Sequence, residues 1–158
     1  MTAEAAALRI RRMRAADLEQ VMAIAASLKG APQWPRAAYV SALGKDSTPR
    51  RIALVAEEPG SGALAGFAVA SFLAPLAELE TIAVSAEEQR RGIGRKLFFA
   101  LVDELRAAAA SEFLLEVRAS NQRALGFYCS LGWNEAGRRP RYYADPEEDA
   151  VLMSLGLG

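Results

Sequence analysis

The stretch from Glu87 to Leu97, EEQRRGIGRKL, combines two glycines with several cations, and this combination suits an anion. An apolar run, Leu79 to Val84, comes directly before it, and a helical pattern follows. The first N–H groups of a helix have no partner within the helix, and the helix dipole adds partial positive charge there. Because glycine lets the backbone approach a ligand closely, the pattern predicts a bound phosphate. An ordinary helix start with solvated arginines is the alternative.

The glycine pair does not match two common phosphate-binding signatures. No Gly-Lys-Ser/Thr follows, so the loop is not a Walker A sequence. Gly92 and Gly94 would need a third glycine at position 97 to complete a dinucleotide fingerprint, and Leu97 stands there. What remains is the pattern Q-x-x-G-x-G, flanked by cations.

The absence of histidine limits the chemistry that this chain can perform. Without histidine, and with Cys129 as the single cysteine, Ser-His-Asp and Cys-His nucleophile systems and the usual zinc ligand sets are excluded. A carboxylate-only Mg²⁺ or Ca²⁺ site remains open, but no spaced Asp/Asn/Gly loop is present, so we expect no metal. Proton transfer therefore falls to Glu, Asp, Tyr, Lys, Cys or water.

Length and composition indicate a single domain spanning residues 1–158, with 52% hydrophobic residues to form its core. Basic and acidic residues balance at 19 each, so the basic excess of a general nucleic-acid binder is absent. No apolar run approaches the ~20 residues of a membrane span, and the N-terminus lacks the order of a secretion signal. A single cysteine excludes an internal disulfide. We expect a cytoplasmic protein without nucleic-acid or membrane partners.

Hydrophobic periodicity predicts strands at 6–12, 51–57, 63–73, 78–84, 113–118, 133–137 and 148–155. It predicts helices at 17–28, 36–43, 92–110 and 121–131, the last ended by Gly132 in a left-handed conformation. Strands dominate early, and strands alternate with helices later. This order predicts the α/β (α+β) class, with a mixed sheet covered by helices on both faces.

The segment LETIAVSAEEQRRGIGRKLFFALVDEL resembles the acetyl-CoA-binding motif of the GNAT N-acetyltransferase superfamily. The later NQRALGFYCSLGW is similar to the N-x-x-A-x-x-F-Y-x-x-x-G-F/W segment of that family, and the resemblance extends from about Leu8 to Leu155. It implies acetyl-CoA as co-substrate and a mostly antiparallel sheet of about six to seven strands. The pantetheine arm would pair with the strand at Ile82, Ala83 and Val84. The backbone of the motif would hold the pyrophosphate, at Gln89, Arg90, Arg91, Gly92, Ile93, Gly94 and Arg95.

A narrower resemblance links LLEVRASNQRALGFYCSLGW and RRPRYYADPEEDAVLM to the bacterial ribosomal-protein-alanine N-acetyltransferases. These enzymes acetylate the N-terminal amine of a small-subunit ribosomal protein. The resemblance implies a protein N-terminus as acceptor, bound beside Trp34, Tyr142 and Tyr143. Thr81 stands where that branch often has Asn, and the sequence around Trp34 departs from the usual one. Because that segment lies where the family receives its acceptor, a small amine is the alternative acceptor.

Acetyl transfer requires that the acceptor ammonium lose a proton, and Glu116 is the predicted base. An α-amine, with a pKa of ~8, loses its proton more easily than a lysine at ~10.4. In FLLEVR, Glu116 lies in an apolar strand on the same face as Leu114 and Arg118, where partial burial would raise its pKa. The alternative is an ion pair with Arg118 or another cation, which would lower that pKa. The resemblance favours the base, acting directly or through a water.

The departing thiolate benefits from an acid, and the resemblance assigns that role to Tyr128. On spacing alone Tyr128 is better explained as a core residue, because Leu125, Tyr128 and Leu131 lie near helical spacing. Asn121 is expected to cap the same helix and, by resemblance, to contact the coenzyme arm.

Two questions stay open at the level of sequence. Arg138, Arg139 and Arg141 fit either a solvated turn or a surface that guides the acceptor. An alternative function of a different class is a module that binds the coenzyme without catalysis. The presence of Glu116 and Tyr128 beside an intact glycine motif argues against that module.

Overall fold

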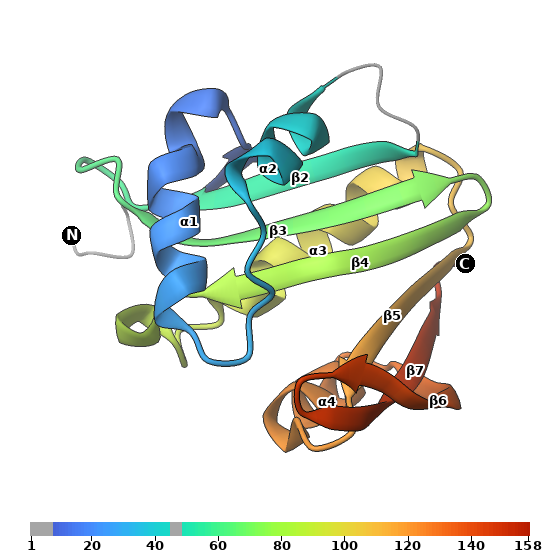
Figure 1. Ribbon diagram of the computed structural model, residues 1–158. Coiled ribbons are helices and arrows are strands. Elements are labelled where there is room, and N and C mark those ends of the chain that lie inside the picture. Colours follow the sequence, from blue (N-terminus) through green and yellow to red (C-terminus); the bar gives the residue numbers. More distant parts are fainter. Residues whose placement is uncertain (1–7, 45–48) are drawn as a thin grey trace.

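The computed structural model describes residues 8–44 and 49–158, which form a seven-stranded mixed sheet with helices on both faces (Figure 1). The strand order is β1-β2-β3-β4-β5-β7-β6, and only the pair β4 and β5 is parallel. The strands are β1 (Arg9–Arg12), β2 (Arg50–Glu57), β3 (Leu64–Leu73), β4 (Leu76–Val84), β5 (Glu112–Arg118), β6 (Asn134–Ala144) and β7 (Glu147–Gly156). The helices are α1 (Leu18–Ser27), α2 (Arg36–Leu43), α3 (Ile93–Ala107) and α4 (Gln122–Ser130), with 3-10 turns η2 (Ala15–Asp17) and η3 (Ala86–Glu88). The predicted fold class is confirmed.

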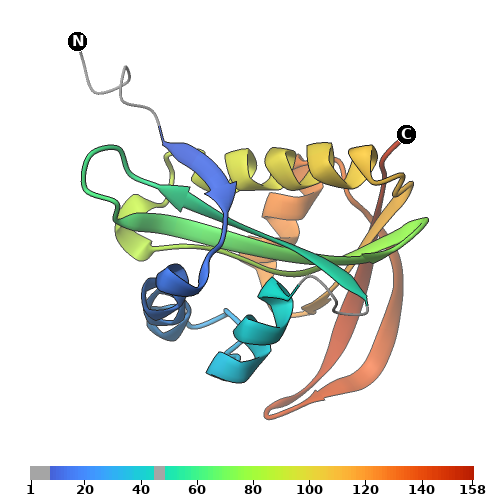
Figure 2. The ribbon, with the colours of Figure 1, turned by 90° about the horizontal axis from the view of Figure 1, so that it is seen from above.

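The two faces of the sheet carry different helices (Figure 2). The alternation of side chains along β2 shows this directly, because successive residues point to opposite faces. Ile52 and Leu54 pack in the cluster that includes α3, whereas Ala53 and Val55 pack in the cluster that includes α1 and α2. Leu125 of α4 packs against the α3 cluster.

The parallel strands β4 and β5 separate soon after they begin. Their pairing covers only Leu76–Glu78 against Glu112–Leu114. Beyond those residues β4 continues to Val84 and β5 to Arg118, and the strands diverge in Figure 1. The carboxyl ends of both strands therefore lie at the same, open side of the sheet, where the segments leading to α3 and α4 also begin.

Among the described residues, three element boundaries differ from the sequence prediction by two residues or more. The prediction that the sixth strand ends at residue 137 is wrong, because β6 extends to Ala144 through residues 138–144, whose charges and Pro140 suggested a turn. Pairing of Tyr143 and Ala144 with β7 supplies the tertiary support that the local sequence does not reveal. β4 begins two residues early, at Leu76, and α3 ends at Ala107, three residues before its predicted end. Residues 6 and 7 of the first predicted strand lie outside the described residues.

None of the helices within residues 8–44 and 49–158 has the length and apolar character that a membrane crossing requires.

Candidate functional site

The glycine loop, residues 89–95, follows β4 and η3 and includes the first three residues of α3. Arg90 and Gly92 have left-handed backbones, with φ of 71° and 78°, and Gly92 is the residue directly before the helix. In the described part of the chain, no protein group accepts a backbone hydrogen bond from Ile93, Gly94 or Arg95, as expected for a first helical turn. The loop therefore offers N–H groups at the positive end of a helix dipole, an arrangement that suits a phosphate.

The side chains of the glycine loop connect β4 with α4, across the place where β4 and β5 diverge. Gln89 donates from Nε2 to the Val84 carbonyl over 3.0 Å and accepts a hydrogen bond from Arg123 of α4. Phe127, one turn after Arg123, lies so close to Gly94 that a Cβ added there would be 3.2 Å from its ring. Gly94 thus lets α4 pack closely against the loop. Packing is therefore a second reason for glycine at this position, beside the approach of a ligand.

The free edge of β4 exposes the backbone of Ile82 and Val84. The N–H of Ser85 donates to Ala65 on β3, so by strand alternation Ala83 also directs its backbone groups toward β3. Ile82 and Val84 consequently direct theirs away from β3, toward the diverging β5. These groups are available to an extended ligand that adds to the strand edge.

Glu116 lies on β5, the strand that faces β4 across the place where the two diverge. Phe113, Leu115 and Val117 pack in the α3 cluster, so alternation places Glu116 on the face that carries α1 and α2. Its carboxylate accepts a hydrogen bond from the Tyr142 hydroxyl at 3.1 Å on one oxygen. Its other oxygen lies 2.9 Å from Nε of Arg139.

The ion pair of Glu116 with Arg139 is the contact that the alternative interpretation required, an ion pair with Arg118 or another cation. Arg118 itself pairs with Glu148. The side chain of Glu116 remains 20% exposed, and that of Arg139 is 59% exposed, so the pair faces solvent. Of the arginines that the sequence left open, Arg139 therefore belongs to the site. Arg138 pairs with its neighbour Glu135 on the exposed surface.

Two further carboxylates accompany Glu116 on this side of the sheet. The pKa of Glu78 is raised, first by burial and then by the negative charges of Glu116 and Glu80, while Arg139 opposes the rise. Glu80, which occupies a bulge in β4, is paired with Arg51 at 2.9 Å. The charge distribution favours a cation here. Glu78 and Glu80 were not among the predicted site residues, although both lie in the strand predicted directly before the glycine loop.

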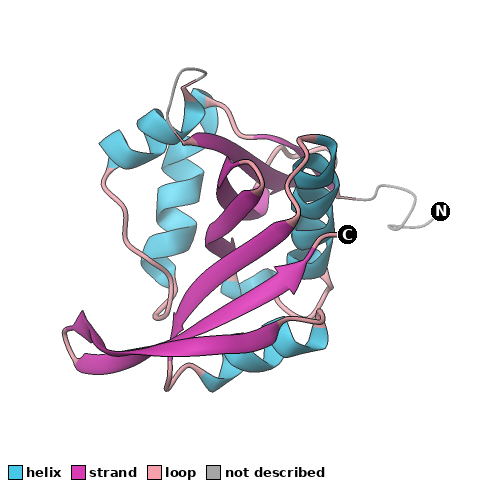
Figure 3. Cartoon of the chain, turned by 90° about the vertical axis from the view of Figure 1, so that its right-hand side faces the viewer, coloured by secondary structure: helices cyan, strands magenta, loops and turns pink. Residues whose placement is uncertain are grey.

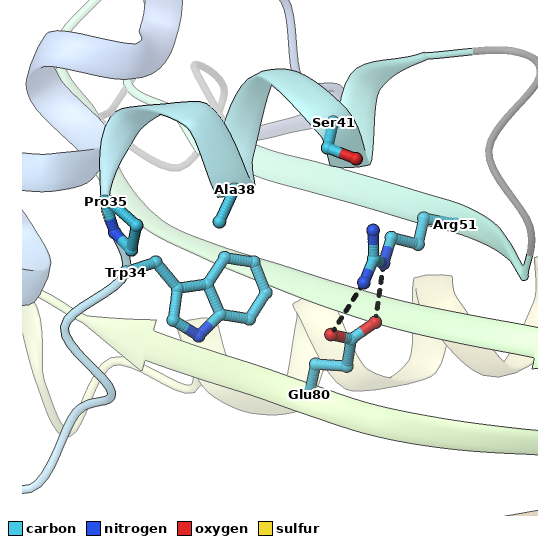
Figure 4. A pocket seen from close by; sticks show the side chains of 6 residues that line it. All are labelled: Trp34, Pro35, Ala38, Ser41, Arg51 and Glu80. Carbon is cyan, nitrogen blue, oxygen red and sulfur yellow. Dashed lines mark hydrogen bonds and ion pairs between the residues drawn. The ribbon is translucent and has the colours of Figure 1, made fainter.

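Trp34 lies in a separate open pocket of about 260 Å³ at the start of α2 (Figure 4). Its indole is 4.9 Å from the ring of Tyr39, and the Arg51–Glu80 pair forms the opposite wall. Tyr142 and Tyr143 lie on β6, with ring centroids 5.1 Å apart. The structure therefore brings the tyrosine pair to Glu116 and places Trp34 beside Glu80.

Tyr128 approaches from the face that carries α3. Its ring packs 5.8 Å from Trp133 in the α3 cluster, as the core interpretation predicted. Burial raises the pKa of Tyr128 to about 12, so its hydroxyl is protonated at neutral pH. Within residues 8–44 and 49–158 that hydroxyl has no hydrogen-bond partner. Asn121 caps the same helix, as predicted, accepting from the N–H of Ala124 at 3.1 Å, and Gly132 has the predicted left-handed backbone, with φ of 98°.

The raised pKa of Tyr128 predicts a loss of stability at high pH. An unfolded tyrosine ionises near pH ~10, whereas the folded one ionises near pH 12. The folded state therefore holds its proton more tightly, and the resulting stability is complete below pH ~10 and is lost as the pH rises through the folded pKa. We expect the free energy of unfolding of the wild type to fall by about 2–3 kcal/mol more than that of Tyr128→Phe over this range. Equal pH dependence of both proteins, measured by denaturant titration, would contradict the burial of this hydroxyl.

Comparison with known proteins gives the same picture of the chain. Residues 16–133 match the family model described as "Acetyltransferase (GNAT) family". A relative from Escherichia coli K12, named [Ribosomal protein bS18]-alanine N-acetyltransferase, is 44% identical over 99 residues, which are 61% of this chain and 67% of the relative. A Bacillus subtilis relative, whose name assigns it provisionally to the same activity, is 33% identical over 91% of this chain and 92% of its own length.

Solved structures agree along nearly the whole chain. The crystal structure of the ribosomal-protein-S18-alanine N-acetyltransferase from Escherichia coli superimposes with a TM-score of 0.82 and 34% identity, over 96% of this chain and 94% of that one. Chaetomium thermophilum Naa20, in complex with a bisubstrate analogue, gives a TM-score of 0.82 and 26% identity over 94% and 86%. The chain is therefore an N-acetyltransferase that belongs to the acetyltransferase (GNAT) family.

Proposed function

We propose that this enzyme transfers an acetyl group from acetyl-CoA to the N-terminal α-amine of a protein, with a ribosomal protein as the first candidate. One observation carries the proposal: Glu116 and Tyr142 meet beside the diverging strands β4 and β5, at the side where the glycine loop offers free N–H groups. The Escherichia coli and Bacillus subtilis relatives, both named for the alanine of bS18, support the choice of acceptor.

The residues of the open edge fit acetyl-CoA. The N–H groups of the glycine loop would hold the pyrophosphate, and Arg90 and Arg95 would add positive charge around it, whereas Arg91 is already paired with Glu58 and Glu88. The backbone of Ile82 and Val84 would pair with the amide groups of the pantetheine arm. The carbonyl of Val84 already accepts from Gln89, and its second lone pair remains available. Asn121, the residue directly before α4, would contact this arm from the other side.

Glu116 and Tyr128 would handle the protons of the transfer. The amine nitrogen forms a bond to the acetyl carbon as the bond from that carbon to sulfur breaks, and over the reaction the nitrogen loses two protons. Glu116 accepts one, directly or through a water, and passes it to solvent, and the second proton of the nitrogen also passes to solvent. Tyr128 donates to the departing sulfur and regains its proton from solvent. A pKa of about 12 keeps this hydroxyl in the form that donates.

The two groups approach from opposite faces of the sheet. Glu116 belongs to the face of α1 and α2, and Tyr128 packs on the face of α3. In a continuous sheet the intervening backbone would separate them, whereas diverging strands allow both to reach one carbonyl. Arg139 holds one oxygen of Glu116, and its exposure lets an incoming ammonium take its place there.

The acceptor would lie on the face of α1 and α2. Tyr142 and Tyr143 would form one wall, and Trp34 would form another beside Glu80. Three carboxylates on this face, Glu78, Glu80 and Glu116, outnumber the two arginines that pair with them, and this excess of negative charge favours a cationic acceptor. We place the reaction in the cytoplasm, in keeping with a single cysteine and no internal disulfide.

The proposal is tested by comparing acceptors. Acetyl-CoA would be incubated with a peptide copying the alanine-initiated N-terminus of bS18 from the same organism, and separately with amino acids, polyamines and aminoglycosides. We expect a kcat/KM for the peptide at least about a hundredfold above that for any small amine, since only the peptide contacts the extended surface. Preference for a small amine would replace the protein acceptor while keeping the enzyme class. Binding of acetyl-CoA without turnover on any amine would support the non-catalytic module.

A further inference from the structure

The ladder between β6 and β7 is interrupted near the turn that joins them, where the N–H of Arg141 donates to the side chain of Asp149 at 2.9 Å. Beyond Arg139 the register of β6 against β7 is interrupted, and pairing resumes only at Tyr143 with Glu148 and Ala144 with Glu147. Arg141, in the interruption, has a left-handed backbone with φ of 50°. The end of this hairpin, residues 140–148, projects from the sheet in Figure 3. We call residues 140–148 the hairpin tip.

Arg118, at the end of β5, contacts the hairpin tip at several places. Its Nη1 donates to the Pro146 carbonyl at 3.0 Å and to the Glu148 carboxylate at 3.2 Å. Its Nη2 donates to the Asp145 carbonyl at 3.4 Å. Its guanidinium carbon lies 4.3 Å from the centre of the Tyr143 ring, within the range of a cation–π contact.

Glu148 extends this connection to the segment that leads to α4. One of its oxygens accepts a hydrogen bond from Arg118, and the other accepts one from the backbone N–H of Ser120. These hydrogen bonds, chiefly the one from Ser120, lower the pKa of Glu148, so it is ionised at neutral pH. Arg118 and Glu148 together join β5, the hairpin tip and the loop before Asn121.

Tyr142 links the hairpin tip to Glu116. Tyr142 lies beside Tyr143 in the hairpin tip and donates its hydroxyl to Glu116, two residues before Arg118 on the same face of β5. Displacement of the tip would move Tyr142 away from that carboxylate and shift the tyrosine wall. We infer that Arg118 is a positioning residue that holds the hairpin tip against β5 and thereby sets the acceptor wall. This role rests on the proposed function, although the contacts themselves do not.

The effect of Arg118→Met separates positioning from general stability. Methionine keeps much of the aliphatic stem but removes all four contacts. We expect the acceptor KM to rise about tenfold or more, because small misplacements of binding groups have large kinetic effects. The dissociation constant for acetyl-CoA should stay unchanged, since the glycine loop lies on a different segment and the substitution keeps the hydrogen bond from Ser120, beside Asn121, to Glu148. Arg118→Lys should recover part of the loss through Glu148 or one carbonyl. Arg138→Met, which removes an exposed arginine from β6, is the matched control and should behave as wild type.

Hydrogen exchange tests the same inference without any acceptor. Amides of the hairpin tip should exchange faster in Arg118→Met than in wild type or Arg138→Met, whereas the amides of α3 should not change. An unchanged acceptor KM in folded Arg118→Met, or unchanged exchange in the tip, would overturn the inference. Parallel loss of acceptor and acetyl-CoA binding, with no recovery in Arg118→Lys, would also overturn it. If wild type acetylated no amine, the proposed function would fail, and the exchange result would still decide the role of Arg118.

Discussion

Glu116→Gln is expected to lower kcat by about a hundredfold or more while leaving the affinity for acetyl-CoA unchanged. Glutamine has nearly the same shape and still accepts from the Tyr142 hydroxyl, but it cannot take a proton from an ammonium at neutral pH. Glu116 points to the face of α1 and α2, whereas the groups proposed to hold the coenzyme lie on β4 and the glycine loop. Steady-state kinetics with a peptide acceptor and a binding titration with acetyl-CoA would measure the two quantities.

A matched control for this substitution is Glu147→Gln, which also removes one carboxylate from the neighbourhood of the hairpin. Glu147 is exposed and only loosely paired, 3.7 Å from Arg141. It should leave kcat unchanged. If Glu116→Gln lost turnover and acetyl-CoA binding to the same degree, Glu116 would be a structural residue, and the ion pair with Arg139 would be its role.

Tyr128→Phe is expected to lower kcat by about a hundredfold, because it removes only the hydroxyl proposed to donate to the departing sulfur. The ring would keep its place beside Trp133, and no protein hydrogen bond would be lost in the described residues. The unfolding temperature and the affinity for acetyl-CoA should therefore stay close to those of the wild type.

The leaving group gives this prediction a sharper test. An acetyl thioester of a more acidic thiol needs less assistance when its bond to sulfur breaks. Such a donor should restore much of the lost rate in Tyr128→Phe and little of it in Glu116→Gln. Equal rescue of both variants, or full activity of Tyr128→Phe with acetyl-CoA, would assign Tyr128 to core packing alone.

The order of helices and strands could be predicted from the local sequence, because the hydrophobic residues of most segments repeat with the period of a helix or of a strand. The alternation in β2 and the apolar stripe of α3 identify their type without tertiary information, and the N-cap of α4 follows from Asn121. The second half of β6 did not follow, because its charged residues and Pro140 become a strand only through pairing with β7. Strand formation there depends on the partner strand β7.

The contacts of Glu116 could be predicted from the sequence only in part. Spacing placed Glu116 with Arg118 on one face of β5, and that placement is confirmed. The identity of its cationic partner was not predictable, since Arg139 reaches it from a strand more than twenty residues away through the irregular part of β6. The connection of Gln89 to Arg123 was hidden for the same reason. Long-range pairs depend on register, which local periodicity does not give.

The measurement that tests the central claim most directly is the position of the acetyl group on a peptide that offers two amines. The peptide would begin with alanine, contain one internal lysine, and be compared with a version blocked at its N-terminus. Fragment-ion mass spectrometry after incubation with acetyl-CoA would locate the modification. The proposed function predicts one acetyl group on the α-amine of the free peptide and none on the blocked peptide. Acetylation of the lysine in both peptides would contradict N-terminal acetylation and make this enzyme a side-chain acetyltransferase.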